Sequence, residues 1–389
     1  MRLYLSVFIL LGIFFIPVSS QFYAIQNWLT EVFFGQLVNW SAYQLNIHWE
    51  LNDFSSDSTR LLLLYGWLLI FSLPIFFFIK NRKESFAKKI ISFTSIFSTY
   101  FIAWILLKYG FDKLFKAQFY SPEPNILYSK VGDLDKDILF WTSMGSSYSY
   151  SVITGLLEII LGILLLFRKT RNLAILLSIG VFVNVLAINV GFDISVKLFA
   201  VFLLLTSLYL AAPFARNLWL FLSNQSFKLS TNNEKLIPEF NGAKWLKLLL
   251  IFGIFLECSY PFMKTSNFND DLAERPIYHG AYEVEAIVRG SDTLSPAKAN
   301  LKRLFFHRDH YLILQDTADS FVDYSYSLNA AQTKIKLIDY NENSKVYTIS
   351  YNPKTTTLLL KNSKEQLICK ALPWKQMALF QPLFHFTVD

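Results

Sequence analysis

Residues 60–79 read RLLLLYGWLLIFSLPIFFFI, an apolar run whose one charged residue, Arg60, stands at its start. A membrane-spanning helix needs about 20 predominantly apolar residues to cross the hydrocarbon core of a bilayer. Lys80, Arg82 and Lys83 follow the run closely, and basic residues beside a span are typical of cytoplasmic loops. This stretch therefore predicts a transmembrane helix that ends at the inner surface of a membrane.

Six further apolar runs have a similar length. They cover residues 3–18, 90–109, 148–167, 173–190, 195–213 and 245–262. The composition agrees, because 53% of the residues are hydrophobic and only 17% are charged, against about 25% charged residues in soluble proteins. We therefore expect residues 1–262 to form an all-α polytopic membrane domain with about seven spans.

The distribution of Lys and Arg predicts the orientation of these spans. The loops after residues 79 and 167 and the segment 214–244 are basic, whereas residues 21–59 contain neither Lys nor Arg. Under the positive-inside rule, the N-terminus lies inside, and the segment 21–59 lies outside as an interfacial helix. The formal charge of +7 is explained by these loops, so the chain lacks the clustered basic face of a nucleic-acid-binding protein.

The first apolar run, residues 3–18, has two interpretations. A lone Arg2 precedes it, and Ser19 and Ser20 follow it. Small residues after a short apolar run suit the cleavage site of a secretory signal peptide. The same run can also be a retained first helix. The topology of the other spans is the same in both cases.

Residues 263–389 have a different pattern, in which apolar and polar residues alternate. The alternating segments are 282–289, 321–328, 333–338, 346–351, 356–360 and 366–370, with Asn, Pro and Ser between them. Short alternating runs at regular spacing are typical of an antiparallel barrel or sandwich. We expect a mainly antiparallel β domain outside the membrane. It contains no catalytic motif, which favours a binding or docking module.

Cysteine and histidine residues are few and widely separated. Cys258 and Cys369 form no CxxC motif, so a disulfide scaffold and an internal thioredoxin-like dithiol are both excluded, whereas a single bridge between the two cysteines stays open. His307 and His310 are three residues apart in an expected strand, where they would face opposite sides. The sequence therefore predicts no metal site.

Glu158 is the most informative residue of the membrane domain, because it lies near the middle of an expected span. A charged side chain there costs about 2.5–3.5 kcal/mol even on the scales that give the smallest penalty. Ser151, Gly155 and Gly162 share its helical face, and small residues let another helix approach closely. Glu158 is either a functional carboxyl that carries a proton or binds a ligand, or a structural hydrogen-bonding partner between helices.

Other polar residues lie toward the outer half of four consecutive spans. They are Lys108, Lys113, Asn184, Asn189, Asp193 and Lys197. Lys108 can extend its amine to the interface, and Asp193 and Lys197 can form an i,i+4 ion pair. Together with Glu158, they predict a four-helix bundle with an outward-facing polar pocket.

Several motifs resemble those of the DoxX-like membrane proteins, especially the longer versions from Bacteroidetes. The motifs are residues 108–119 (KYGFDKLFKAQF), 139–145 (LFWTSMG), 155–158 (GLLE), and Asn184 and Asn189 followed by residues 192–198. The resemblance covers about residues 50–213 and extends more loosely to 278–285. It implies a DoxX-like four-helix core in a bacterial inner membrane, and it adds Tyr109, Gln118 and Trp141 to the candidate ligand-binding residues.

DoxX relatives are linked to quinone-dependent sulfur oxidation and to membrane oxidoreductase complexes that handle thiol stress. The resemblance implies a membrane subunit of a redox system that binds a quinone or another small lipophilic molecule in its bundle. The outer domain would then dock a membrane or periplasmic redox partner protein. The alternative is a non-catalytic binding, carrier or assembly protein. A transporter ranks last, because the spans contain no evident inverted repeat.

Overall fold

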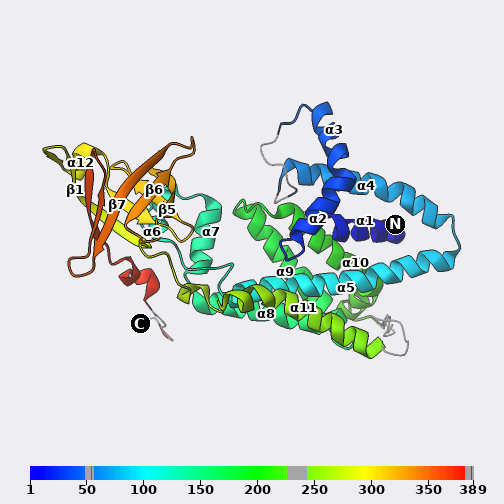
Figure 1. Ribbon diagram of the computed structural model, residues 1–389. Helices are drawn as coiled ribbons and strands as arrows, with labels where there is room; N and C mark the ends of the chain where they lie inside the picture. The colour runs from blue at the N-terminus through cyan, green and yellow to red at the C-terminus, as the bar shows by residue number, and fades with distance from the viewer. Residues whose placement is uncertain (49–53, 55–56, 226–242, 382–386, 388–389) are drawn as a thin grey trace. The chain divides into compact units, whose positions relative to one another are not determined.

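The structure is a computed structural model that describes residues 1–48, 54, 57–225, 243–381 and 387. The chain forms two compact units (Figure 1). The helical unit comprises residues 1–118 and 149–268, and the β unit comprises 119–148 and 269–389. The expected domain boundary at residue 263 lies close to residues 268 and 269, where the chain passes from the helical unit back into the β unit. The sequence did not indicate that residues 119–148 belong to the β unit.

The helical unit contains ten helical elements among the described residues. They are α1 (Arg2–Phe15), α2 (Tyr23–Thr30), the π-helical turn η1 (Glu31–Gly35), α3 (Gln36–Gln44), α4 (Thr59–Lys80), α5 (Glu84–Leu114), α8 (Tyr148–Leu166), α9 (Arg171–Gly191), α10 (Lys197–Leu222) and α11 (Ala243–Thr265). The helix expected within residues 21–59 is confirmed for residues 23–44, whereas residues 49–53 and 55–56 lie outside the described part.

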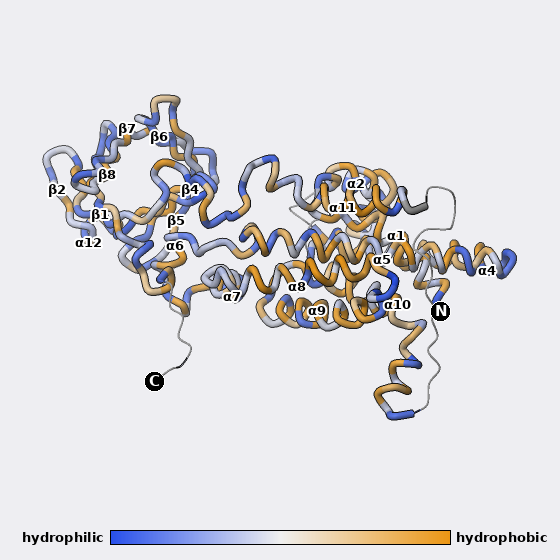
Figure 2. Tube along the Cα trace, turned by 90° about the horizontal axis from the view of Figure 1, so that it is seen from below, coloured by the Kyte–Doolittle hydropathy of each residue, from blue (hydrophilic) through white to orange (hydrophobic). Residues whose placement is uncertain are grey.

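Six of these helices are long and apolar enough to cross a membrane, namely α4, α5, α8, α9, α10 and α11. By this criterion the chain is a multi-pass membrane protein with an all-α membrane domain. Figure 2 shows long hydrophobic stretches along α8 and α9. Two helices extend beyond the expected spans, because α5 reaches Leu114 and α10 reaches Leu222. The segment 226–242 of the expected inner loop lies outside the described residues.

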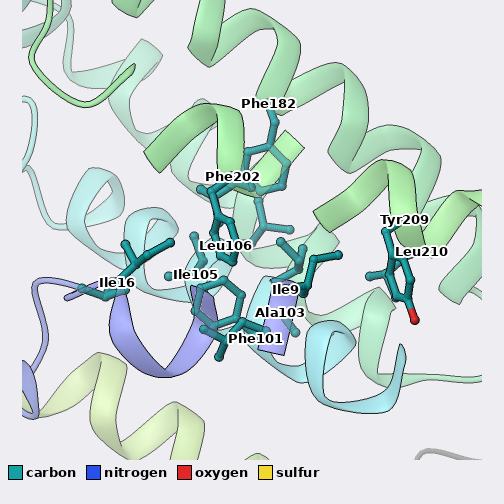
Figure 3. Packing of buried hydrophobic residues seen from close by; sticks show 14 of the residues in the cluster. Ile9, Ile16, Phe101, Ala103, Ile105, Leu106, Phe182, Phe202, Tyr209 and Leu210 are labelled. Atoms are coloured by element: carbon teal, nitrogen blue, oxygen red, sulfur yellow. The ribbon is translucent and has the colours of Figure 1, made fainter. Parts of the chain in front are cut away.

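Helix α1 is shorter than the expected span 3–18, with 14 residues, which rise only about 21 Å. It nevertheless packs into the core of the helical unit, where Ile9 is 1% exposed. Figure 3 shows Ile9 and Phe101 close to Phe202 of α10. The Phe202 ring contacts the rings of Phe8 and Phe101 at centroid distances of 6.2 and 6.1 Å. These contacts place α1 in the core of the helical unit.

The β unit is built on a closed antiparallel barrel of eight strands. They are β1 (Gly280–Arg289), β3 (Arg303–Phe306), β4 (Tyr311–Gln315), β5 (Phe321–Leu328), β6 (Lys334–Ile338), β7 (Ser344–Asn352), β8 (Thr357–Lys361) and β9 (Gln366–Ala371). Each strand pairs with the next, and β9 pairs with β1 to close the barrel. The short strand β2 (Asp292–Leu294) forms a hairpin on β1 through Gly290, whose φ is +60°.

The barrel interior is filled by side chains that alternate along each strand, as the pattern predicted. In β6, Ile335 and Leu337 point inward and are buried, whereas the alternating Lys334 and Lys336 are exposed. Cys369 of β9 and Tyr326 of β5 also belong to this core. Eight-stranded barrels have an interior about wide enough for side chains to fill. The predicted antiparallel β domain is therefore confirmed as a small barrel.

Two barrel strands, β3 and β4, were not predicted. Residues 119–148 contain α6 (Pro124–Leu127), the 3₁₀ turn η2 (Val131–Asp133) and α7 (Lys136–Gly145), and they cover β3 from outside. Tyr128 stacks against Phe305 there, at a centroid distance of 5.7 Å. Because β3 is buried on both faces, it lacks the alternation that identifies a strand exposed on one side. The expected strand through His307 and His310 is wrong, since both lie in the turn between β3 and β4.

Candidate functional site

Helices α5 and α8 approach each other closely at their glycine residues. A side chain at Gly155 of α8 would meet the backbone of α5, with a Cβ only 2.7 Å from the Gly110 oxygen. Two helical turns further along α8, a Cβ at Gly162 would lie 3.0 Å from the Ala103 oxygen. Small residues allow such backbone approach. The predicted close packing at the Glu158 face of α8 is therefore confirmed, and its partner is α5.

This close packing brings Glu158 of α8 beside Lys113 of α5. Glu158 Oε2 lies 2.6 Å from Lys113 Nζ, and the two side chains are 9% and 10% exposed. Ser151 of α8 donates a hydrogen bond to the Lys113 carbonyl oxygen at 2.7 Å. A buried charge requires such a partner, because desolvation otherwise costs several kcal/mol. Two of the predicted residues therefore form one buried ion pair.

Helix α11 adds a second carboxylate, which the sequence analysis did not include among the candidates. Trp104 of α5 donates a hydrogen bond from its ring nitrogen to Glu257 Oε2 at 2.5 Å. The buried thiol of Cys258 lies 3.7 Å from the same oxygen. Cys258 packs with Leu107 of α5 and Ile159 of α8. The polar residues of α5 therefore contact α8 on one side and α11 on another.

Lys108 and Tyr109 of α5 lie beside these polar residues of α5, α8 and α11. Lys108 Nζ lies 3.0 Å from Asp112 Oδ2, and the Tyr109 ring centroid lies 5.4 Å from Lys108 Nζ and 5.9 Å from Lys113 Nζ. We call the following residues the α5–α8–α11 polar cluster: Trp104, Lys108, Tyr109, Asp112, Lys113, Glu158, Glu257 and Cys258. It contains two ammonium groups and three carboxylates, so one added proton would offset the excess negative charge.

A second polar group lies at the start of α10. Asp57 accepts hydrogen bonds from the backbone N–H groups of Lys197 and Leu198, both at 2.9 Å. Lys197 Nζ lies 2.8 Å from Asp193 Oδ1 and 3.6 Å from Asp57 Oδ2. A carboxylate at a helix N-terminus is stabilised by the unpaired N–H groups and the helix dipole. This Asp57 group fixes the connection between α9 and α10, and it shares no residue with the cluster.

The remaining predicted residues have different surroundings. Asn189 is buried, and its amide donates to the Val196 carbonyl at 3.5 Å, whereas Asn184 is exposed. Gln118 donates its backbone N–H to the Asp112 carbonyl, and its side-chain oxygen is buried without a hydrogen-bond partner among the described residues. Trp141 belongs to the β unit, where its ring packs on Phe119. The structure therefore has two polar groups where the sequence predicted one pocket.

The β unit contains a buried carboxylate that sequence reasoning missed. Glu123, just before α6, is 5% exposed, and its Oε2 lies 2.8 Å from His279 Nε2. The Arg308 backbone N–H donates to the same oxygen at 3.3 Å, and the Arg308 guanidinium also pairs with Asp270. Asp270 pairs in addition with Arg275 at 2.9 Å. This Glu123 network fastens residues 119–148 to the barrel.

Two groups in and beside the Glu123 network, Glu123 and His307, have lowered pKa values. Burial alone would raise the pKa of Glu123, but the hydrogen bond from His279 and the neighbouring positive charges outweigh burial and lower this pKa below its usual value. Burial lowers the pKa of His307, because the imidazolium form is poorly solvated there. Near neutral pH, therefore, Glu123 is ionised and His307 is neutral.

A groove of about 730 Å³ lies between residues 125–138 and the outer face of strands β4 and β5. Four aspartates line it, namely Asp133, Asp135, Asp319 and Asp323, and its lining residues include no Lys or Arg. Asp319 is held by Lys302 and Lys130 at 2.6 and 2.9 Å, and these hydrogen bonds lower its pKa to about 2. Apolar side chains such as Ile138 and Ile313 line the rest. The groove is therefore both acidic and partly apolar.

Comparison with known proteins gives little information on function. No family model matches the chain, and no solved structure gives a significant match. A segment of 97 residues is 31% identical to the uncharacterized protein YwoB of Bacillus subtilis (strain 168). The match covers 25% of this chain and 61% of YwoB, so the chain spans about three fifths of that relative's length. The resemblance to DoxX-like proteins stays a prediction.

Proposed function

We propose that the chain is a membrane subunit of a redox system, and that its helical unit binds a quinone or a similar small lipophilic molecule. The α5–α8–α11 polar cluster is the proposed binding site. The observation that carries this proposal is the buried ion pair of Lys113 and Glu158 inside a helical bundle. Ionisable residues within membrane spans are rare and usually mark pathways for protons, ions or ligands.

The chemistry of the cluster suits both forms of a quinone. An oxidised quinone presents carbonyl oxygens, which need donors, and Lys108 supplies an ammonium group that is 16% exposed. A quinol presents hydroxyl groups, which need acceptors. The excess carboxylate of the cluster supplies one acceptor. The buried side-chain oxygen of Gln118, which has no hydrogen-bond partner within the described part of the chain, supplies a second.

Reduction of a quinone to a quinol consumes two electrons and two protons. The cluster can hold and deliver one proton at a time, because its carboxylates outnumber its ammonium groups by one, and both protons are taken up from water in turn. The electrons must come from a partner, because Cys258 and Cys369 are free thiols in different units and form no dithiol. The proposal therefore requires a membrane or periplasmic redox protein that docks on this chain.

The acidic groove of the β unit is the proposed docking surface for that partner. Asp133, Asp135 and Asp323, together with the apolar patches of the groove, complement a basic, amphipathic segment, whereas Asp319 is already paired with two lysines. Complementary charge chiefly accelerates association and selects partners. In this proposal the N-terminus is cytoplasmic and the β unit is periplasmic, in a bacterial inner membrane, as the basic loops predict.

The test is to purify the full-length protein in a mild detergent and to quantify extracted quinones by mass spectrometry. We expect wild type to retain quinone in a stoichiometric amount and Glu158→Gln to lose most of it. Lys197→Gln is the matched control, because Lys197 belongs to the Asp57 group, and it should retain quinone like wild type. Wild-type protein that carries no quinone, even after incubation with one, would refute the redox proposal.

The alternative is a non-catalytic carrier or assembly protein that uses the same cluster. Retention of a lipid without redox chemistry, lost in Glu158→Gln and kept in Lys197→Gln, would support this alternative. Cross-linking a basic peptide to the groove, with loss on Asp133→Asn and Asp135→Asn substitution, would support docking in either case.

A further inference from the structure

A small cavity lies among four helices of the helical unit, away from the residues of the polar cluster. Its volume is about 50 Å³, whereas one water needs roughly 10–15 Å³ on this scale. The lining residues are Arg2 of α1; Ser95, Ile96 and Thr99 of α5; Arg171, Asn172 and Ile175 of α9; and Leu210, Pro213 and Phe214 of α10. The cavity is therefore large enough for a compact polar group.

Two arginines line this cavity, and its lining residues include no carboxylate. Arg2 donates to Ser95 Oγ at 3.5 Å, and its guanidinium lies 5.5 Å from the centroid of the Tyr209 ring. The Nε of Arg2 is buried and has no hydrogen-bond partner among the described residues. A buried, unsatisfied donor on a charged group is costly. Arg2 therefore has unused capacity to bind an anion.

The surrounding residues hold Arg2 in place. The Tyr209 hydroxyl lies 2.8 Å from Ser6 Oγ and donates to the Ile91 carbonyl oxygen at 3.2 Å. Figure 3 shows Tyr209 and Leu210 side by side on α10, in the packed core of the helical unit. Arg171 donates from Nε to the Leu165 carbonyl oxygen at 3.3 Å and is 9% exposed. Both guanidinium groups are therefore held in position by the residues around the cavity.

The cavity also has polar and apolar parts. Its polar side combines the two guanidinium groups with Ser95, Thr99 and Asn172 at the start of α9, where helix N–H groups and the dipole favour an anion. The other side is formed by Ile96, Ile175, Leu210, Pro213 and Phe214. Guanidinium groups bind phosphate in a bidentate manner. A ligand with a phosphate and attached hydrocarbon chains matches both sides.

We propose that this cavity binds the phosphate of an anionic phospholipid headgroup, with the acyl chains along its apolar side. Arg2 and Arg171 lie at the helix ends that the basic loops predict to face the cytoplasm, where anionic lipids attract basic residues. The site is independent of the proposed quinone site, since the two share no residue.

The experiment measures the affinity of the purified full-length protein for phosphatidylglycerol in neutral detergent micelles, by native mass spectrometry. Phosphatidylcholine and inorganic phosphate are the comparison ligands. We expect wild type to prefer phosphatidylglycerol over both. Arg2→Gln should weaken the affinity at least about tenfold, as expected for loss of a charge-assisted hydrogen bond. Lys169→Gln removes an exposed charge two residues from Arg171 and should stay within about twofold of wild type.

Loss of Arg2 also removes a charge that helps to orient α1, so a second variant is needed. Ile96→Trp fills the cavity from its half-buried apolar side and keeps both arginines, and it should also abolish the preference. The melting temperature of each variant without lipid reports folding. Equal wild-type affinity for phosphatidylglycerol and phosphatidylcholine would overturn the proposal. If wild type binds inorganic phosphate but not phosphatidylglycerol, the ligand of the cavity is not a lipid headgroup. If wild type and Arg2→Gln bind phosphatidylglycerol with equal affinity, the lipid does not bind in this cavity.

Discussion

The two units hold their buried carboxylates in different ways. In the helical unit, Glu158 has one close ionic partner, Lys113, and glycines bring the two helices together. In the β unit, Glu123 accepts from both His279 and the Arg308 backbone, and Arg308 also binds Asp270. A bundle in lipid needs few polar contacts, because each is costly to bury. The β unit instead satisfies its buried carboxylate with several hydrogen-bond donors and positive charges.

The difference predicts that single substitutions in the Lys113–Glu158 pair have the largest effect. Glu158→Leu leaves Lys113 as a buried charge, and breaking such a pair costs about 3–5 kcal/mol. The double variant Lys113→Met with Glu158→Leu removes both charges and should regain most of the lost stability. Thermal unfolding in detergent measures both. If the double variant is as unstable as Glu158→Leu, the instability does not come from leaving Lys113 as a buried charge, and the account of the helical unit is contradicted.

Glycine packing between α5 and α8 should give the next largest effect. Gly155→Ala places a methyl group against backbone atoms, which cannot move aside, and we expect a loss of up to about 3 kcal/mol. Gly180→Ala in α9 is the matched control, because nothing lies within 4 Å of its Cβ position. Alanine favours helix formation there by about 1 kcal/mol, so this control should be neutral or slightly stabilising. Similar melting temperatures for both variants would argue against close packing at Gly155.

The Glu123 network should tolerate substitution better than the buried pair. Glu123→Gln keeps the shape but removes the charge, and we expect a loss of about 2 kcal/mol from the unfolding free energy of the β unit. Glu274→Gln, at an exposed position, should change stability by less than about 0.5 kcal/mol. Hydrogen exchange of residues 119–148 gives a local readout. Unchanged protection of this segment in Glu123→Gln would contradict its fastening role.

The pH dependence of the β unit should be the smallest effect. The lowered pKa of Glu123 means that its contribution to stability is complete above about pH 4.5 and is lost as the pH falls further. The lowered pKa of His307 acts in the same direction, since the unfolded chain takes up its proton first, below about pH 6.5. Protection of the β unit should therefore fall between pH 7 and pH 4. Protection that stays constant or rises as the pH falls over this range would contradict the lowered pKa values of Glu123 and His307.

Most of the fold follows from the sequence because its signals are local. The apolar runs identified six helices that are long enough to cross a membrane, and alternation identified six of the eight barrel strands. The strand β4 lacks alternation in sequence because Leu312, Ile313 and Leu314 are three apolar residues in a row. The strand β3 was missed because residues 119–148 bury its outer face, which removes the alternation. That packing depends on a long-range contact, and no local pattern encodes it.

Some residues of the candidate sites could also be predicted from local sequence signals, whereas others could not. Glu158 and Lys113 could be selected from the sequence, because a charge within an apolar run is conspicuous. Glu123 could not, since a carboxylate in a polar loop has no distinguishing signal. The cavity at Arg2 was missed for a related reason, because an arginine at the start of a span has an ordinary role in orientation. Only the meeting of α1, α5, α9 and α10 reveals it.

The most direct test of the account is whether the α5–α8–α11 polar cluster binds quinone. Trp104 belongs to the cluster, so a bound quinone should quench its fluorescence. Titration of the full-length protein with a short-chain quinone should give saturable quenching, absent in Trp104→Phe. The affinity should weaken at least about tenfold in Lys108→Met, which loses a charged donor, and should be unchanged in Lys197→Gln. Quenching that never saturates, and that is the same in wild type and all three variants, would contradict the account.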